Sequence, residues 1–137
     1  MNDTLKLEIV TPAAKVYSED VDMVTLPGVE GQMGILPQHV PLMTQLVPGE
    51  VIVRKDGADR FLAVGEGLIE VTAGSVAILT DMAVAVEQID EAKVEEARQR
   101  AAARLREKLS AEEVASVNAS LARALAQLHV KRRHHQT

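Results

Sequence analysis

The chain has 137 residues, of which 47% are hydrophobic, and a formal net charge of −5 at pH 7. This length suits one domain, or one domain with an appendage. Aromatic residues make up only 1% of the chain, which argues against a surface that stacks nucleic-acid bases. The chain has no cysteine, which excludes disulfides, thiolate zinc sites and cysteine nucleophiles.

The charge is unevenly divided along the chain. Residues 1–88 hold 13 acidic and 5 basic residues, whereas residues 89–137 hold 7 acidic and 10 basic residues. Such a division indicates two units that have different partners or that attract each other. We see no signal peptide and no apolar run of about 20 residues. We therefore expect a cytosolic protein that reaches a membrane only by binding something else.

The first unit, residues 1–88, is predicted to be all-β. Leu5, Leu7 and Ile9 alternate with polar residues, as in a half-buried strand. We expect further strands at 16–26, 44–47, 51–54, 61–64, 67–71, 76–80 and 83–86. Asp56 with Gly57 predicts a hairpin whose loop is longer than two residues, and Ala73 with Gly74 predicts another. Many short strands between turns favour an antiparallel sandwich or a flattened barrel.

The segment 27–42, PGVEGQMGILPQHVPL, holds three glycines, three prolines and one histidine. Glycine permits positive φ or close backbone approach, and proline prevents a long helix. Because Ile35 and Leu36 are apolar, we expect a rigid, irregular, partly buried loop, which is a common place for function. Two interpretations of His39 stay open: its side chain bonds the loop backbone, or it contacts a partner.

The second unit, residues 89–137, is predicted to be an antiparallel helical hairpin. Residues 89–130 contain neither glycine nor proline. Asp90 is the expected N-cap of a first helix to about residue 108, and Ser110 with Glu113 predicts a capping box for a second helix to about residue 130. The seams are rich in alanine and bury little area. The hairpin therefore needs a second surface, on which it is either permanently docked or free to move.

No pattern in the sequence supports catalysis. The chain lacks a Gly-x-Ser-x-Gly elbow, a His-Glu-x-x-His pair and a phosphate-binding loop. His129, His134 and His135 lie in a basic tail, where no carboxylate or cysteine completes a metal site. The negative total charge and the confinement of the basic residues to one hairpin make nucleic acid a poor partner. We expect no catalytic residue, no metal and no nucleic acid.

Three residues of the first predicted helix have the spacing of an anion site. Asp90, Lys93 and Arg100 lie at i, i+3 and i+10, near one face of the helix. They could hold a nucleotide phosphate. The alternative is a solvated face with local ion pairs such as Glu96 with Arg100.

Taken together, these features resemble the epsilon subunit of bacterial F-type ATP synthases, called delta in mitochondria. The resemblance covers essentially the whole chain. It rests on residues 5–11 and 14–17, on LPGVEGQMGILPQHVPLM at 26–43, on residues 49–53 and on IDEA at 89–92. It implies a ten-stranded β-sandwich followed by two helices, in a non-catalytic subunit of the central rotor stalk.

The resemblance also implies partners. The sandwich would bind the gamma subunit and lie on the ring of c subunits, coupling proton translocation to ATP synthesis at the cytoplasmic face of the bacterial plasma membrane. Glu30, Gln32 and His39 would face the c ring. Many relatives have an acidic residue where this chain has Gln32, so a hydrogen bond would replace a salt bridge there.

In the family the hairpin regulates the complex. Folded down it packs on the sandwich, and extended it reaches the alpha and beta subunits and blocks ATP hydrolysis. The basic candidates for those contacts are Arg98, Arg100, Arg104, Arg123, Lys131, Arg132 and Arg133.

Some relatives bind ATP through Ile/Leu-Asp-x-x-Arg-Ala. Here Asp90 matches and Arg100 falls at a second family arginine, but Lys93 and Val94 replace Arg-Ala. Lysine cannot form the bidentate fork of arginine, so ATP would be only a weak regulatory ligand, and no cofactor is required. Two alternatives from other classes remain: a free-standing nucleotide sensor and a small hydrolase, which lacks a nameable nucleophile–base pair.

Overall fold

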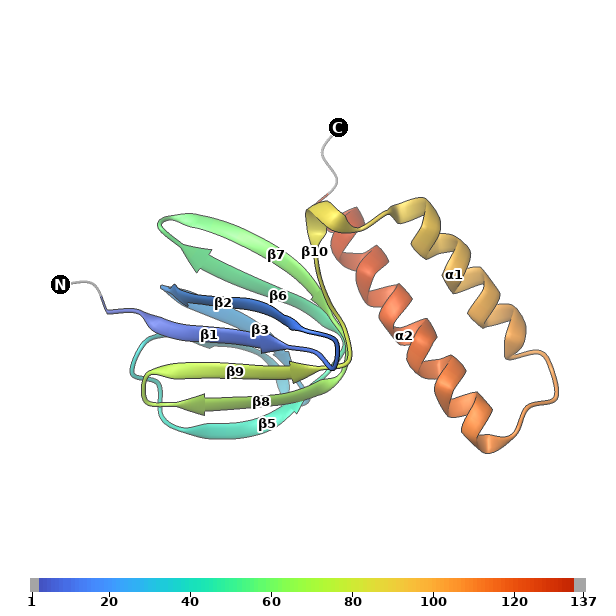
Figure 1. Cartoon of the computed structure of the whole chain (residues 1–137), viewed down its shortest axis with the longest axis horizontal. Coiled ribbons are helices and arrows are strands. Elements are labelled where there is room, and N and C mark those ends of the chain that lie inside the picture. The colour runs from blue at the N-terminus through green and yellow to red at the C-terminus, as the bar shows by residue number, and fades with distance from the viewer. Residues whose placement is uncertain (1–2, 135–137) are drawn as a thin grey trace.

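Figure 1 shows the computed structural model of the chain, which describes residues 3–134: a β-sandwich beside a pair of antiparallel helices. The strands are β1 (Leu5–Val10), β2 (Lys15–Val21), β3 (Met23–Gly28), β4 (Gly31–Ile35), β5 (Leu42–Leu46), β6 (Gly49–Lys55), β7 (Ala58–Val64), β8 (Gly67–Thr72), β9 (Ser75–Thr80) and β10 (Ala83–Ala85). A 3₁₀ turn, η1 (Val86–Gln88), leads to helices α1 (Glu91–Arg104) and α2 (Ala111–Arg133). The predicted fold class, an all-β sandwich followed by a helical hairpin, is confirmed.

The sandwich is one continuous ladder of strands folded over an apolar core. The strands pair in the order β10-β7-β6-β3-β5-β8-β9-β1-β2, with β4 added beside β3. Each pairing is antiparallel except that of β1 with β9. The predicted alternation in β1 holds, because Leu5, Leu7 and Ile9 are all buried. Their partners in the core include Leu26, Ile35, Leu46, Ile69 and Ile78.

The hairpin turns follow the sequence closely, with one correction. Thr72 pairs with Ser75 across the predicted Ala73 and Gly74 turn. Lys55 pairs with Ala58, so the β6–β7 loop has two residues, and the prediction of a longer loop was wrong. Asp56 and Gly57 have φ of 53° and 80°, the left-handed values that a tight hairpin turn of this length requires.

Two other β-predictions were wrong in extent. The strand expected at 16–26 is broken at Asp22, because β2 pairs with β1 whereas β3 pairs with β6. Asp22 fixes the break: its amide donates to the carbonyl of Arg54 and its Oδ2 accepts from the amide of Asp56. The segment 27–42 is only partly loop, because β4 pairs with β3 along its length.

The helices also differ from the prediction at their C-terminal ends. Helix α1 ends at Arg104 instead of near residue 108. Just after this end, the amides of Arg106 and Glu107 donate to the carbonyls three residues back, of Ala103 and Arg104. Helix α2 continues to Arg133 instead of residue 130. The N-termini are as predicted: the Asp90 side chain accepts from the amide of Lys93, and Ser110 with Glu113 forms the capping box.

The hairpin packs on one end of the sandwich. Helix α2 lies between α1 and the strands, where it contacts β6 and β7 (Figure 1). The buried apolar centre of this contact is small and consists of Ala63, Ile89 and Val130, flanked by Phe61 and Met82. Such a limited core is consistent with the weak apolar seam that the alanine-rich sequence predicts.

Candidate functional site at the hairpin–sandwich interface

Polar contacts surround the small apolar centre of the interface. Arg123 Nη1 lies 3.1 Å from Asp81 Oδ2, between α2 and the turn before β10. Lys131 Nζ donates to the carbonyl of Val86 at 3.1 Å. The docked hairpin therefore makes polar contacts with distant segments in addition to its apolar centre.

The C-terminal end of α2 meets a buried carboxylate. The Glu50 side chain on β6 is only 6% exposed. Arg133 Nη1 lies 3.2 Å from its Oε1, and His134 Nε2 lies 2.5 Å from its Oε2. The His134 ring also stacks on Phe61 of β7, with centroids 3.7 Å apart and 21° between the planes. Two strands and the end of α2 thus meet at one cluster, which sequence reasoning missed because the residues are far apart in the chain.

The two helices are joined by an acidic–basic network. Arg98 Nη2 lies 2.7 Å from Glu95 Oε1 within α1, and Arg132 of α2 reaches Glu91 at 2.9 Å and Glu95 at 3.7 Å. The hydrogen bonds from the Arg98 guanidinium lower the pKa of Glu95 to about 2, with a further contribution from Arg132. Arg132 is therefore the residue of this network that links α2 to α1.

Each basic residue predicted to contact the catalytic subunits has an oxygen partner within the chain. Arg100 pairs with Glu96 at 3.1 Å, as the solvated-face interpretation predicts, and Arg104 lies 3.6 Å from Glu113. With the contacts above, this accounts for Arg98, Arg100, Arg104, Arg123, Lys131, Arg132 and Arg133. In the docked hairpin each of these basic groups is paired within the chain, while Arg100 and Arg104 keep half or more of their side chains exposed.

The three candidates for nucleotide binding lie in different surroundings. Lys93 lines a cavity of about 340 Å³ between α1, α2 and the sandwich, together with Asp81, Arg123 and Gln127. Arg100 is not among the lining residues, and the Asp90 carboxylate caps its own helix. The structure therefore brings Lys93 together with Arg123 rather than with Arg100. Sequence spacing within one helix could not reveal a partner on the other.

The candidates for the c-ring face lie on either side of β4, at the turn before this strand and in the segment after it. Glu30 and Gln32 are exposed at the β3–β4 turn, and His39 lies in the segment before β5. His39 Nδ1 donates to the carbonyl of Val40 at 2.7 Å, which confirms the backbone-bonding interpretation of this residue. In the same segment the apolar side chain of Val40 is 71% exposed, and Met43, the second residue of β5, is 65% exposed.

A further exposed apolar surface, which the sequence analysis did not predict, covers strands β5, β8 and β9. Leu68 and Leu79 are directly paired across β8 and β9, and both are about half exposed. Met43 lies on the neighbouring strand β5. Grouped exposed apolar residues mark interaction surfaces more often than isolated ones do, although Met43 is paired with Glu70 and Leu68 with Gln45 here.

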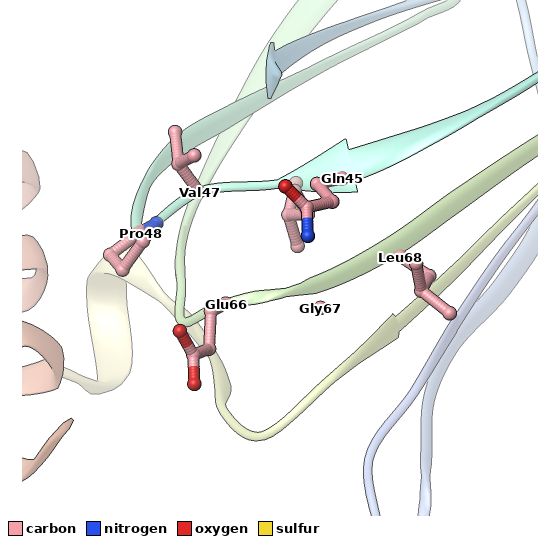
Figure 2. Close-up of a pocket in the computed structure, with 7 residues that line it drawn as sticks. Gln45, Val47, Pro48, Glu66, Gly67 and Leu68 are labelled. Carbon is pink, nitrogen blue, oxygen red and sulfur yellow. The ribbon is translucent and has the colours of Figure 1, made fainter. Parts of the chain in front are cut away.

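The end of the sandwich nearest the hairpin carries an open pocket of about 380 Å³. Figure 2 shows Gln45, Val47 and Pro48 on one side and Glu66, Gly67 and Leu68 on the other. Glu66 is the one charged residue in its lining, so the pocket lacks the paired groups of acid–base catalysis. Within residues 3–134 no group of three His, Asp or Glu side chains is placed to hold a metal ion. None of the helices described is long and apolar enough to cross a membrane.

Comparison with known proteins gives the family. Residues 4–86 match the family model "ATP synthase, Delta/Epsilon chain, beta-sandwich domain", and residues 87–132 match "ATP synthase, Delta/Epsilon chain, long alpha-helix domain". The chain belongs to the delta/epsilon chain family of ATP synthases. Members of this family are non-catalytic subunits of the central stalk, which sets aside the hydrolase alternative.

Individual relatives agree with this assignment. The chain is 44% identical over 126 residues to the ATP synthase epsilon chain of Herpetosiphon aurantiacus, covering 92% of this chain and 93% of the relative. It is 40% identical over 131 residues to that of Alkalilimnicola ehrlichii, covering 95% and 94%. A chain in the Euglena gracilis mitochondrial ATP synthase structure of OSCP, F1 and c-ring aligns with a TM-score of 0.75 and 26% identity, covering 92% of this chain and 79% of that one.

Proposed function

We propose that this epsilon-type subunit joins the gamma subunit to the c ring and so helps to couple proton translocation to ATP synthesis. The exposed apolar surface formed by Met43, Leu68 and Leu79 supports a permanent protein partner, for which gamma is the proposed occupant. The structural neighbour from Euglena gracilis comes from an assembly that contains a c-ring. The sandwich is the part of the chain assigned to assembly.

The proposed contact with the c ring is made by the β3–β4 turn and the segment before β5. Glu30 and Gln32 offer exposed polar groups to polar loops of the ring, and His39 holds its own segment through the Val40 carbonyl. Gln32 donates or accepts a neutral hydrogen bond there. These contacts would hold the subunit at the cytoplasmic face of the bacterial plasma membrane through the complex.

The hairpin is the proposed brake on ATP hydrolysis. The observation that carries this proposal is the composition of its docking surface. It combines a small apolar centre with ion pairs made by Arg123 and Arg133, two of the basic residues that would meet acidic groups of the alpha and beta subunits. If the hairpin exchanges acidic partners on the sandwich for acidic partners on the alpha and beta subunits, the free-energy difference between its docked and extended positions stays small. A difference of a few kcal/mol is enough to move such an equilibrium almost completely.

ATP is proposed as a weak regulatory ligand of the docked form. Lys93 and Arg123 line one cavity and could both reach a phosphate, although Asp81 already pairs with Arg123. Calorimetric titration of the isolated chain with ATP tests this second function. We expect weak binding that is lost in Lys93→Ala and kept in Arg106→Ala, which changes the same charge at an exposed position outside the cavity. Equal binding by both variants would contradict the assignment.

The rotor and brake proposals are tested with the matching catalytic complex from which this subunit has been removed. The full chain and a truncation after Glu87 are added back, and binding and ATP hydrolysis are measured. We expect both to bind tightly and only the full chain to inhibit. Binding without inhibition by either would leave a structural coupler, and binding by neither would overturn the rotor assignment.

A further inference from the structure

Helix α2 binds the sandwich without help from α1. Arg123 of α2 pairs with Asp81 at the turn before β10. Lys131 donates to the carbonyl of Val86, and Val130 lies in the small apolar centre of the interface. These contacts join α2 directly to the sandwich, so α1 is not needed to make them.

Helix α1, by contrast, is held mainly by α2. It lies on the far side of α2 from the strands and approaches the sandwich through its first turn, where Val94 packs against the apolar centre (Figure 1). Further along α1 the buried residue is Ala101, and an alanine buries little apolar area. The side chains of Arg104 and Arg132, which pair with carboxylates of the other helix, are 50% and 54% exposed, so each pair contributes little. The contact of α1 with α2 is therefore weak along most of its length.

The length of α1 decides what happens when this contact is lost. Helix α1 has 14 residues, whereas α2 has 23. Isolated helices shorter than about 12–15 residues are marginal in water, and a local pair such as that of Glu96 with Arg100 adds little. Away from α2, α1 therefore loses most of its helical structure.

Both ends of α1 can stay in place while it opens. Ile89, just before the N-cap, is buried in the apolar centre, and residues 105–110 connect the other end to α2. As a helix, the 14 residues of α1 span about 21 Å, whereas the same residues fully extended span about 46–50 Å. An unwound α1 therefore has enough slack to leave α2 without pulling α2 from the sandwich.

We propose that α1 is a strap that opens and closes over α2 while α2 stays docked on the sandwich. This inference is independent of the proposed brake, in which the whole hairpin moves. The open strap uncovers Val117, Ala124 and Leu128, which are buried in the closed form. These residues lie at i, i+7 and i+11, on the face of α2 from which Arg132 reaches α1. The strap is therefore a reversible cover of an apolar helix face.

Hydrogen exchange of single amides, followed by NMR on the full chain, tests the strap. After correction for local sequence, we expect amides of residues 95–104 to exchange at least about tenfold faster than those of residues 124–133 in the docked half of α2. Low concentrations of urea should leave the rates in α1 nearly unchanged, because a local opening exposes little surface, but should raise those in α2.

Two adjacent arginines provide matched variants, since each side chain is 54% exposed. Arg132→Gln removes the pairs with Glu91 and Glu95, so exchange in α1 should become about two- to fivefold faster while α2 is unchanged. Arg133→Gln removes a pair with Glu50 of the sandwich, so it should speed exchange at the docked end of α2 and leave α1 unchanged.

Three outcomes would overturn the strap. Equal rates in the two helices would mean that the hairpin opens as one body, which leaves the brake proposal intact. An Arg132→Gln variant that speeds both helices alike would also show that they open together. Exchange in α1 and α2 as slow as in the core of the sandwich would overturn both the strap and the movement that the brake requires.

Discussion

At the scale of single residues, Glu95 is a carboxylate of the hairpin that pairs with two arginines, Arg98 and Arg132. Arg98 Nε and Nη2 lie 2.8 Å and 2.7 Å from its two oxygens. This pairing lowers the pKa of Glu95 to about 2 from its ordinary value of 4.5. The unfolded chain therefore binds the proton more readily, so the pairing stabilises the hairpin at neutral pH and is lost as the pH falls from about 4.5 through about 2.

This pairing predicts a measurable change in one titration. In Arg98→Gln we expect the pKa of Glu95 to rise toward 4.5, observed by NMR titration of its side-chain carboxyl. Arg106→Gln removes a charge at an exposed position of the α1–α2 connection and should leave that pKa in place. A Glu95 titration that is the same in both variants would mean that Arg98 is not its partner in solution.

Gly67 and Gly74 form a second comparison at the residue scale. A Cβ on Gly67 would lie 1.8 Å from the carbonyl oxygen of Leu79, and because this atom is backbone of the paired strand β9, no side-chain rotation relieves the clash. At Gly74 nothing lies within 4 Å of such an atom. We expect Gly67→Ala to lower the free energy of unfolding by about 1–3 kcal/mol and Gly74→Ala to change it by less than about 0.5 kcal/mol. Urea denaturation measures both, and equal losses would contradict the close approach of β8 to β9.

At the scale of elements, the start of α2 depends on one local device. Ser110 and Glu113 exchange side-chain and backbone hydrogen bonds at the first turn. Ser110→Ala should destabilise α2 by about 1 kcal/mol, seen as faster amide exchange in its first turns. Ser116→Ala, at an exposed position inside the same helix, should leave exchange unchanged or slow it, because alanine is the better helix former. Faster exchange in both variants would show that the box is not what holds the helix start.

The elements that the sequence predicts correctly are those fixed by neighbouring residues. The N-cap at Asp90, the box at Ser110 and the turn at Gly74 involve groups at most a few residues apart, so a linear pattern contains them. The break at Asp22 depends on the backbone of β6, more than 30 residues away, and could not be predicted from periodicity. Helix α2 extends beyond Val130 for the same reason, since its last turn is held by the sandwich.

The candidate site shows the same limit. Sequence spacing identified the basic residues of the hairpin and the family resemblance proposed their partners. Neither revealed that Glu50 of the sandwich receives the end of α2 or that Arg123 shares a cavity with Lys93. Both arrangements join segments that only the docking of the two units brings together. The opposite net charges of the units were the one sequence signal that pointed toward them.

At the scale of the whole molecule, the pair formed by Asp81 and Arg123 connects sandwich and hairpin near the middle of α2. The side chains are 33% and 34% exposed, so a pair of this kind contributes only about 0.2–1 kcal/mol. Arg123→Glu replaces that attraction by repulsion and should release part of the hairpin population. We expect a larger radius of gyration in small-angle X-ray scattering than for the parent chain.

Restoring the pair with reversed charges decides whether the contact itself is responsible. Asp81→Lys combined with Arg123→Glu brings opposite charges together again, so the radius of gyration should return toward that of the parent chain, and raised salt should weaken both effects. Arg106→Glu changes the net charge by the same amount at an exposed position and should leave the radius unchanged. A double variant as extended as the single one would mean that Arg123 acts through groups other than Asp81. A compact single variant would mean that the remaining contacts, around Val130 and at the end of α2, hold the hairpin without this pair.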